Sequence, residues 1–232
     1  MPRMVDDNPQ LWSPAVKWGV RPGSYTHLTE FFGPVLGVMR ADNLGDAIAM
    51  VNATGYGLTS GLESLDDREQ AQWRDGIHAG NLYINRVTTG AVVHRQPFGG
   101  MGKSAFGPGI KAGGPNYVAQ LLDWSDVVPE GDPPDRAVAS TEVEVLRKAL
   151  RRELRRDEGV VHHDQLRRIL WALDSYDRRY AEEFSGEHDA FRLVGQDNIR
   201  RYLPVKWLRV RVTPQDSAFE IFARVCAAKT VG

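Results

Sequence analysis

Apolar and polar positions in the first third of the chain alternate between strand and helix patterns. The run GPVLGVMRA at 33–41 is apolar and rich in strand-forming residues, and it predicts a buried strand. Asp42 or Asn43 can cap a helix that follows it. The apolar residues of that helix share one face: Leu44, Ala47, Ile48 and Val51.

Two further strands are predicted at LTSGLES (58–64) and AGNLYIN (79–85). Between them, Asp66 is followed three residues later by Glu69, a spacing typical of a capping box, and a helix is expected through Trp73. The resulting β-α-β-α-β order predicts the α/β class, a parallel sheet covered by helices with functional loops at the strand ends.

The composition changes after residue 126. The segment VVPEGDPPDRAVAS at 127–140 carries three prolines and several charges, which is typical of a connector. Two helices should follow, with apolar faces formed by Val143, Leu146, Leu150 and Leu154 and by Leu166, Ile169, Leu170, Leu173 and Tyr176. A strand at WLRVRV (207–212) and a helix at 214–229 are predicted last.

These patterns suggest three parts. Residues 1–126 form the α/β part, 127–192 a linker and helical segment, and 193–232 the start of a short α/β unit. The final TVG comes before any further strand, so we expect this last unit to be truncated.

Composition excludes several classes of protein. The 232 residues carry a net charge of −1, which gives no overall attraction to nucleic acid or acidic membranes. Apolar residues make up 42%, a share that favours a folded chain over a disordered one. No apolar run is long enough to span a bilayer, and the N-terminus lacks the apolar core of a signal peptide. The single cysteine is compatible with a reducing compartment, and we expect a cytoplasmic protein.

Three features suggest chemistry but have simpler explanations. Cys226 shares a helix side with Ile221 and Phe222, so it is expected to be a buried small hydrophobe and not a nucleophile. His162 and His163 have no ligands at metal-binding spacing. The basic run at 146–159 lies opposite a leucine stripe and lacks interleaved aromatics, which indicates a solvated helix face and not a nucleic-acid site.

The stretch RQPFGGMGKSAFGPGIKAGGPNYV at 95–118 contains seven glycines and three prolines. This composition is not typical of a helix or strand interior, because glycine there costs backbone entropy and proline removes a hydrogen-bond donor. The stretch is therefore either a turn-rich surface loop or a binding loop lined by backbone groups.

The stretch HLTEFFGPVLGV at 27–38 leaves two interpretations open. Glu30 could cap or pair with a nearby arginine. Alternatively, its carboxylate could accept hydrogen bonds from sugar hydroxyls while Phe32 supplies a flat apolar wall for an aromatic ring.

Three motifs occur in one order: TEFFGP, AGNLYIN and QPFGGMGKSAFG followed by KAGGPNYV. Together they resemble the second half of an aldehyde dehydrogenase, from about Asn8 to Leu122. The details are most similar to the glutamate-γ-semialdehyde (1-pyrroline-5-carboxylate) dehydrogenases, which occur alone or fused to proline dehydrogenase in proline-utilisation proteins. A weaker similarity, in GQDNIRRYLP and the segment after it, implies that residues 193–232 are the truncated start of the additional C-terminal aldehyde-dehydrogenase-like domain of some long proline-utilisation proteins.

The resemblance implies a partial aldehyde dehydrogenase fold, NAD as cofactor and glutamate semialdehyde as substrate. Glu30 would hold the nicotinamide ribose hydroxyls, and Phe32 would pack beside the nicotinamide ring. The N–H groups of Gly113 and Gly114 would face the substrate α-carboxylate. Ser104 and Ala105 would support that pocket.

The resemblance also implies that no catalytic residue lies in this chain. The family's cysteine nucleophile, glutamate base, asparagine oxyanion donor and NAD-phosphate loop precede the TEFFGP motif, and only 29 residues precede Glu30 here. We therefore expect an incomplete enzyme that is inactive alone. Its expected partners are a missing N-terminal half or a proline dehydrogenase domain, within a homo-oligomer. The alternative is a non-catalytic oligomerisation module derived from the same fold.

Overall fold

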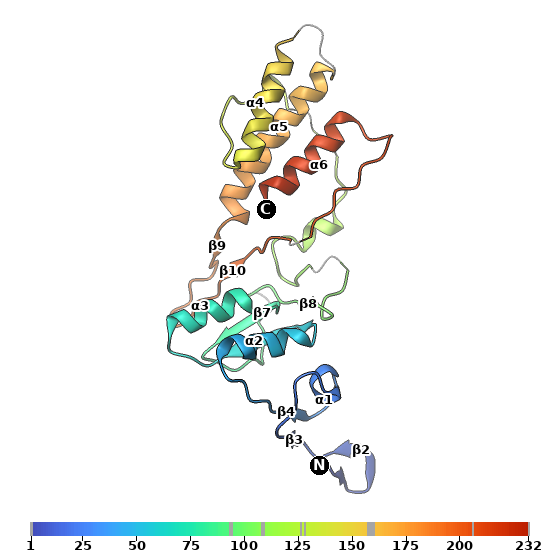
Figure 1. The fold of residues 1–232 in the computed structure, drawn as a ribbon, viewed down its shortest axis with the longest axis vertical. Coiled ribbons are helices and arrows are strands. Elements are labelled where there is room, and N and C mark those ends of the chain that lie inside the picture. The colour runs from blue at the N-terminus through green and yellow to red at the C-terminus, as the bar shows by residue number, and fades with distance from the viewer. Residues whose placement is uncertain are drawn as a thin grey trace. The chain divides into compact units, whose positions relative to one another are not determined.

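The computed structural model describes residues 2–92, 95–107, 110–125, 127, 129–156, 161–205 and 207–231. Contacts divide the chain into two compact units, Met1–Leu122 and Asp123–Gly232. In Figure 1 the first unit is coloured from blue to green, and the three long helices of the second unit are yellow, orange and red. No helix among the described residues is long and apolar enough to cross a membrane.

The first unit begins with two pairs of short strands. Strands β1 (Met4–Val5) and β2 (Asn8–Trp12) form an antiparallel hairpin. Strand β3 (Ala15–Lys17) pairs in parallel with β4 (Val35–Gly37), and helix α1 (Tyr25–Leu28) lies between them in sequence. The strand predicted at 33–41 is therefore only three residues long, and it is exposed and not buried as predicted. Its partner β3 is a strand that the hydrophobic pattern did not predict.

A β-α-β unit forms the centre of this half of the chain. Strand β6 (Thr59–Leu62), helix α3 (Asp67–Gly76) and strand β7 (Asn81–Ile84) follow one another, and the two strands pair in parallel. This confirms the expected α/β class. Because β4 pairs with β3 and not with β6, however, the predicted β-α-β-α-β sheet is observed only in its second half.

Helix α2 (Leu44–Ala53) packs with α3 against the β6–β7 pair. Their shared core consists of Ile48, Trp73 and Ile77, with Leu44, Leu62, Leu82 and Ile84 packed against it. Asn43, and not Asp42, caps α2 by accepting the N–H of Asp46 at 2.9 Å. Asp66 caps α3, but no reciprocal capping box forms, because the carboxylate of Glu69 instead accepts the hydroxyl of Ser64 at 2.6 Å.

Two shorter elements complete the first unit. Strand β5 (Tyr56–Gly57) pairs antiparallel with β8 (Met101–Gly102), which connects the glycine-rich stretch to the segment before β6. A single turn of 3-10 helix, η1 (Val118–Leu121), ends the unit.

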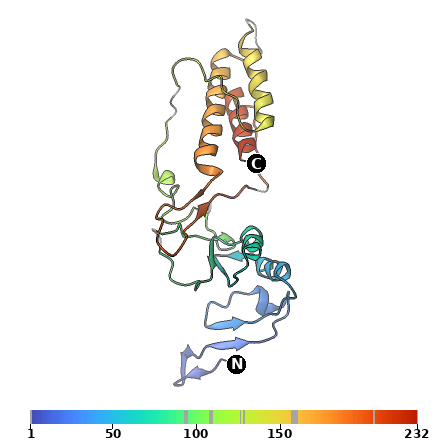
Figure 2. The same ribbon diagram turned by 90° about the vertical axis from the view of Figure 1, so that its left-hand side faces the viewer.

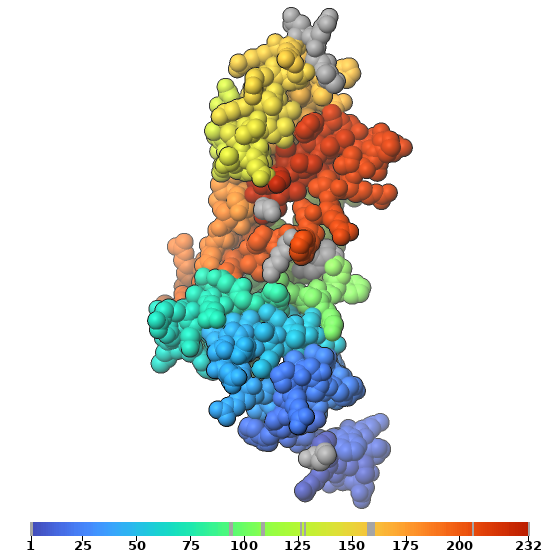
Figure 3. Space-filling model, viewed as in Figure 1, coloured from blue at the N-terminus to red at the C-terminus, as the bar shows by residue number. Residues whose placement is uncertain are grey.

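The second unit contains the helices α4 (Thr141–Leu154), α5 (His163–Arg179) and α6 (Ala218–Thr230). Figure 2 shows them side by side, and in Figure 3 the yellow surface of α4 borders the red surface of α6. A short π-helical turn, η2 (Tyr180–Phe184), extends α5, and β9 (Glu187–His188) pairs antiparallel with β10 (Arg200–Arg201).

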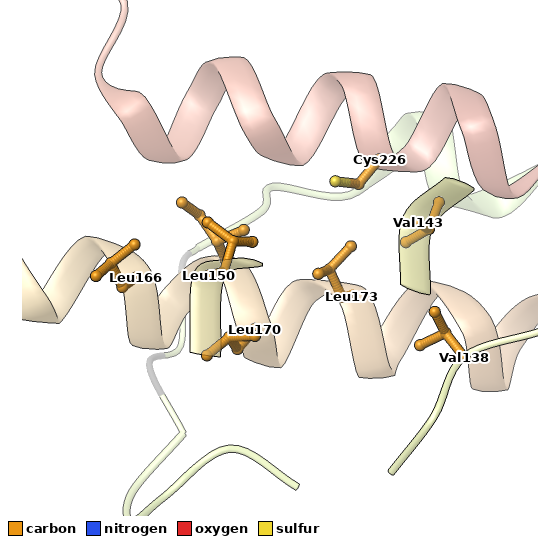
Figure 4. Close-up of a cluster of buried hydrophobic side chains, with 8 residues drawn as sticks. Val138, Val143, Leu150, Leu166, Leu170, Leu173 and Cys226 are labelled. Carbon is orange, nitrogen blue, oxygen red and sulfur yellow. The ribbon is translucent and has the colours of Figure 1, made fainter. Parts of the chain in front are cut away.

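One core joins the three helices. The buried residues are Val138, Val143, Leu150, Leu166, Ile169, Leu170, Leu173 and Cys226. Figure 4 shows Cys226 of α6 directed toward the leucines of α5. Segments 127–192 and 193–232 thus contribute to the same core, and their assignment to separate domains stays a prediction.

Two expectations for the second unit are wrong. Residues 207–212 form no strand. The strand in this part of the chain is β10, which lies upstream and pairs with β9. The basic positions of α4 are also not uniformly solvated. Arg147 is buried, since its guanidinium pairs with Glu144 at 2.7 Å and with Asp135 at 2.8 Å. A buried arginine that is paired in this way cannot be distinguished from a solvated one by spacing alone.

Candidate functional site

Glu30 and Phe32 lie in the loop between α1 and β4. This loop borders a cavity of about 340 Å³, whose lining residues are Thr26, Thr29, Glu30, Phe31, Phe32, Gly33, Val35 and Gly37. Glu30 is exposed, and its carboxylate makes no hydrogen bond or ion pair within the part of the chain that the structure describes. Neither the capping role nor the arginine pair considered for Glu30 is therefore seen, and its oxygens are free to accept hydrogen bonds from a ligand.

Phe32 adopts an unusual backbone conformation. Its φ angle is +48°, in the left-handed region that bulky residues rarely enter, and its side chain is 93% exposed. Such a conformation costs free energy and tends to persist at functional sites. The chain thus presents a large aromatic ring to solvent beside an unpaired carboxylate.

His27 fixes this loop to helix α2. Its Nδ1 accepts the N–H of Gly23 at 2.9 Å, so its Nε2 must carry the proton that is donated to the carbonyl of Met50 at 2.7 Å. Tyr25 and Phe31 pack edge to face, with ring centroids 5.8 Å apart. The hydrophobic pattern of the sequence gave no signal for His27, because its role depends on contacts with distant backbone.

The glycine-rich stretch returns to the β-α-β unit through backbone pairing. Phe98 and Ala112 exchange both N–H···O bonds at 2.9 Å, which closes the loop between them. Lys111 lies at the base of this loop and donates its Nζ to the carbonyls of Gly80 and Gly99, at 2.9 and 2.6 Å. Burial lowers the pKa of the Lys111 amine.

Asn81 clamps the same region from β7. It is buried, its Nδ2 donates to the carbonyl of Pro97, and its Oδ1 accepts the N–H of Gly99, both at 3.1 Å. Asn81 and Lys111 together hold both ends of the loop. The sequence patterns predicted neither residue; the signal available for Asn81 was a polar residue at the start of an otherwise apolar strand.

Gly113 and Gly114 differ in their backbone. Gly113 has a φ of +70°, and its N–H makes no hydrogen bond within the described residues. The N–H of Gly114, in contrast, donates to the carbonyl of Lys111 at 3.1 Å. Of these two glycines, Gly113 is the one whose N–H has no partner among the described residues.

Ser104 and Ala105 lie in a turn after β8. The Oγ of Ser104 accepts the N–H of Gly57 at 3.1 Å, and the N–H of Ala105 donates to the carbonyl of Gly102. The cavity at Glu30 is lined by residues between 26 and 37. Its lining includes neither Ser104 and Ala105 nor the two glycines. The structure therefore gives two separate candidate surfaces in the first unit.

Cys226 lies in the second unit and is 1% exposed. Burial raises the pKa of its thiol to about 11, so the thiolate form needed for nucleophilic attack is suppressed at neutral pH.

The family model of the aldehyde dehydrogenase family matches residues 3–127, more than half of the sequence. The chain belongs to the aldehyde dehydrogenase family. This confirms the resemblance inferred from the TEFFGP, AGNLYIN and KAGGPNYV motifs.

Two individual proteins are similar to part of this chain. The chain is 52% identical over 103 residues to the bifunctional protein PutA of Rhizobium meliloti, a match that covers 44% of this chain and 8% of that protein. It is 46% identical over 90 residues to the 1-pyrroline-5-carboxylate dehydrogenase of Bacillus cereus, which covers 39% of this chain and 17% of that protein. The matched segments thus span less than a fifth of the length of these relatives.

A solved structure of proline utilization A (PutA) from Corynebacterium freiburgense is similar to almost the whole chain. The TM-score is 0.76 at 37% sequence identity, and the match covers 99% of this chain and 22% of that one. The helical second unit is therefore part of the similarity to PutA, beyond the aldehyde dehydrogenase segment.

Proposed function

We propose that this chain supplies nicotinamide and substrate contacts to an NAD-dependent dehydrogenase that oxidises L-glutamate γ-semialdehyde to glutamate in proline catabolism. The observation that carries the proposal is the pairing of Glu30 and Phe32. An unpaired carboxylate and a strained, exposed phenyl ring lie side by side on a cavity of about 340 Å³.

The residues around this cavity fit the ribose and ring of a nicotinamide nucleotide. The Glu30 carboxylate would accept hydrogen bonds from the ribose hydroxyls, and a neutral side chain would accept them less strongly. Phe32 offers its face to the nicotinamide ring, and His27 holds the loop so that both side chains keep their positions. NAD bound here would supply the hydride acceptor for oxidation of the aldehyde.

The glycine-rich loop is proposed to bind the amino-acid end of the substrate. The free N–H of Gly113 donates to the α-carboxylate, and the absence of a side chain permits close approach. The Gly114 N–H can join it only if its bond to Lys111 is given up. The hydroxyl of Ser104 contributes a further donor while its oxygen accepts from Gly57, and Ala105 supports the same turn.

We infer that the 232-residue chain has no dehydrogenase activity by itself. Its one cysteine is buried among the helices of the second unit, where its thiol is protonated. The names of the PutA relatives, a bifunctional protein and a protein of proline utilisation, support a proline dehydrogenase domain as the partner activity. A homo-oligomeric assembly and a cytoplasmic location complete the proposal.

A chimera tests the proposal. Residues 3–127 of this chain replace the matching part of the Bacillus cereus 1-pyrroline-5-carboxylate dehydrogenase, and oxidation of glutamate semialdehyde is followed by NADH absorbance. We expect an active chimera in which Glu30→Gln raises the KM for NAD and lowers kcat about tenfold or more, because charge-assisted hydrogen bonds to ribose are lost. The matched control is Glu63→Gln, a substitution in the segment after β6 that lines neither candidate surface.

Two results would oppose the proposal. Kinetics with NAD that stay unchanged in Glu30→Gln would remove Glu30 from the cofactor site. Turnover by the isolated 232-residue chain that disappears in Cys226→Ser would show that the chain carries its own nucleophile.

A further inference from the structure

A second cavity, of about 290 Å³, lies on helix α4 in the second unit. Its described lining consists of one carboxylate, Asp135, and five cationic side chains: Arg147, Lys148, Arg151, Arg152 and Arg155. Nothing in the proposed dehydrogenase function uses this cavity, which belongs to a different unit from Glu30 and Gly113.

The lining carries a large excess of positive charge. Among the described lining residues, five cations and one carboxylate give a net charge of +4, and Glu144, which pairs with Arg147 and Lys148 from outside the lining, lowers this to +3. The guanidinium groups of Arg152 and Arg155 form no ion pair with any carboxylate of the described ranges. These two groups are exposed and available to an anionic ligand.

The floor of the cavity is held in place. Arg151 donates its Nη2 to the carbonyls of Pro133 and Pro134, both at 2.6 Å, while its buried Nε has no hydrogen-bond partner within the described part of the unit. Arg147 is fixed by Glu144 and Asp135. Two of the five cations are therefore already ordered, which reduces the entropy that binding a ligand would cost.

Favourable placement at a helix C-terminus accounts for only part of this charge. A helix end carries roughly half a negative charge, and its influence falls off within the last turn. That effect can explain Arg151, Arg152 and Arg155, but Arg147 and Lys148 lie upstream of the last turn. The net charge of +3 on the described cluster also exceeds the roughly half a negative charge at a helix end.

We propose that this cavity binds a soluble oligophosphate, either inorganic pyrophosphate or the phosphate chain of a nucleotide. Guanidinium groups match phosphate oxygens in a bidentate geometry, and four of the five cations are arginines. Lys148 and Arg155 are seven residues apart, a distance of roughly 10 Å along a helix, so linked phosphates reach more of the row than a single phosphate does. The volume is near the lower end of small-ligand sites, about 300 Å³. The described lining residues include no aromatic side chain on which a nucleic-acid base could stack.

Isothermal titration calorimetry of the full 232-residue chain with pyrophosphate tests this inference. We expect saturable binding that weakens with added salt, and a loss of at least about tenfold in affinity in the double variant Arg152→Ala/Arg155→Ala. The matched control is Arg156→Ala. This residue is adjacent in sequence, exposed and paired with Glu153, and it does not line the cavity. Lys148→Ala is a second variant, and circular dichroism checks that each variant is folded.

Other ligands are distinguished in parallel arms. Orthophosphate should bind more weakly than pyrophosphate, and ATP should bind at least as well. Flotation with phosphatidylcholine vesicles, with and without phosphatidic acid, tests a lipid phosphate as the source, and we expect no recruitment. The inference is overturned by a wild-type chain that does not bind pyrophosphate, or by equal losses in Arg156→Ala. It is also overturned by arginine-dependent binding of single-stranded RNA or of vesicles that exceeds pyrophosphate binding.

Discussion

The Nζ of Lys111 lies 2.6 Å from the carbonyl oxygen of Gly99, and the same amine also donates to the carbonyl of Gly80 at 2.9 Å. One partly buried lysine thus joins the end of the glycine-rich loop to its beginning and to the segment before β7. The proposed anchor for the substrate carboxylate begins two residues later, at Gly113.

Lys111→Met should destabilise the first unit by about 1–3 kcal/mol at neutral pH, because two carbonyl oxygens lose their donor. Burial holds the pKa of the amine below its ordinary value of 10.5, so between the folded and unfolded pKa values the unfolded chain binds more protons. The stability advantage of the wild type over Lys111→Met should therefore grow as pH rises toward 10.5 and level off above it. Urea unfolding of both proteins across this range measures the difference, and an advantage that shrinks with rising pH would contradict the assignment.

Gly80→Ala should disrupt the same junction. A Cβ at Gly80 would come within van der Waals overlap of the carbonyl oxygen of Gly99 and the amine of Lys111, so the loop must move. We expect a loss of about 2 kcal/mol or more, in the range of overpacked interiors. Gly186→Ala is the control, since a Cβ there meets its nearest neighbour at 3.6 Å. Equal melting temperatures for the two variants would show that the junction is not tightly packed.

The sequence predicted the elements whose pattern is local. The β6-α3-β7 unit, helix α2 with Asn43 at its cap, and helices α4 and α5 all follow apolar spacing and capping residues that a short window contains. The sequence did not predict the elements that depend on pairing with another strand. The run at 207–212 alternates like a strand but has no partner, and β3 forms because β4 lies beside it.

The residues of the candidate site likewise differ in whether the sequence could predict them. Glu30 and Phe32 could be chosen from the sequence because a carboxylate and two aromatics before Gly-Pro are unusual in a strand start. His27, Asn81 and Lys111 could not, because each acts through backbone atoms that are 12 to 31 residues away. The difference between Gly113 and Gly114 is likewise a property of backbone geometry, which two identical letters cannot encode.

Glu144 should make the second unit sensitive to acid. The hydrogen bond from Arg147 lowers the pKa of its carboxyl from 4.5 to about 2. A depressed carboxyl pKa stabilises the fold above 4.5, and this stability is lost as pH falls through about 2. The wild type should be more stable than Glu144→Gln by about 2–3 kcal/mol at neutral pH, and this difference should disappear in strong acid. Unfolding followed by circular dichroism of the helices measures it. A constant difference across that range would mean that the carboxyl is not coupled to Arg147.

Cys226 should resist alkylation in the native chain. Its thiol is buried between α5 and α6 and its pKa is raised to about 11, so both access and thiolate formation are suppressed at neutral pH. Iodoacetamide should modify the native protein only at the rate at which the second unit opens, and should modify the urea-unfolded protein rapidly. Mass spectrometry of the two reactions provides the comparison. Rapid labelling of the folded chain would reopen the question of a nucleophile within it.

Phe32→Gly should make the chain more stable and the enzyme worse. At a φ of +48°, glycine relieves the clash between Cβ and the backbone, which costs roughly 1–2 kcal/mol for other residues, and the exposed ring contributes little burial in the isolated chain. Some of this gain is offset by the greater flexibility of glycine in the unfolded chain, so we expect a net stabilisation of about 0.5–1 kcal/mol. In the Bacillus chimera, the same substitution should lower kcat/KM for NAD, because the wall beside the nicotinamide ring is gone.

Phe106→Gly is the matched control for Phe32→Gly. The Phe106 ring is also almost fully exposed, but its backbone is not left-handed, so glycine should not stabilise the chain there. Hydrogen exchange in the first unit measures stability in both variants, and chimera kinetics measure NAD use. If Phe32→Gly stabilises the chain without impairing NAD use, the strain at Phe32 serves no function in cofactor binding; if it destabilises the chain, the ring is held by contacts that outweigh the strain.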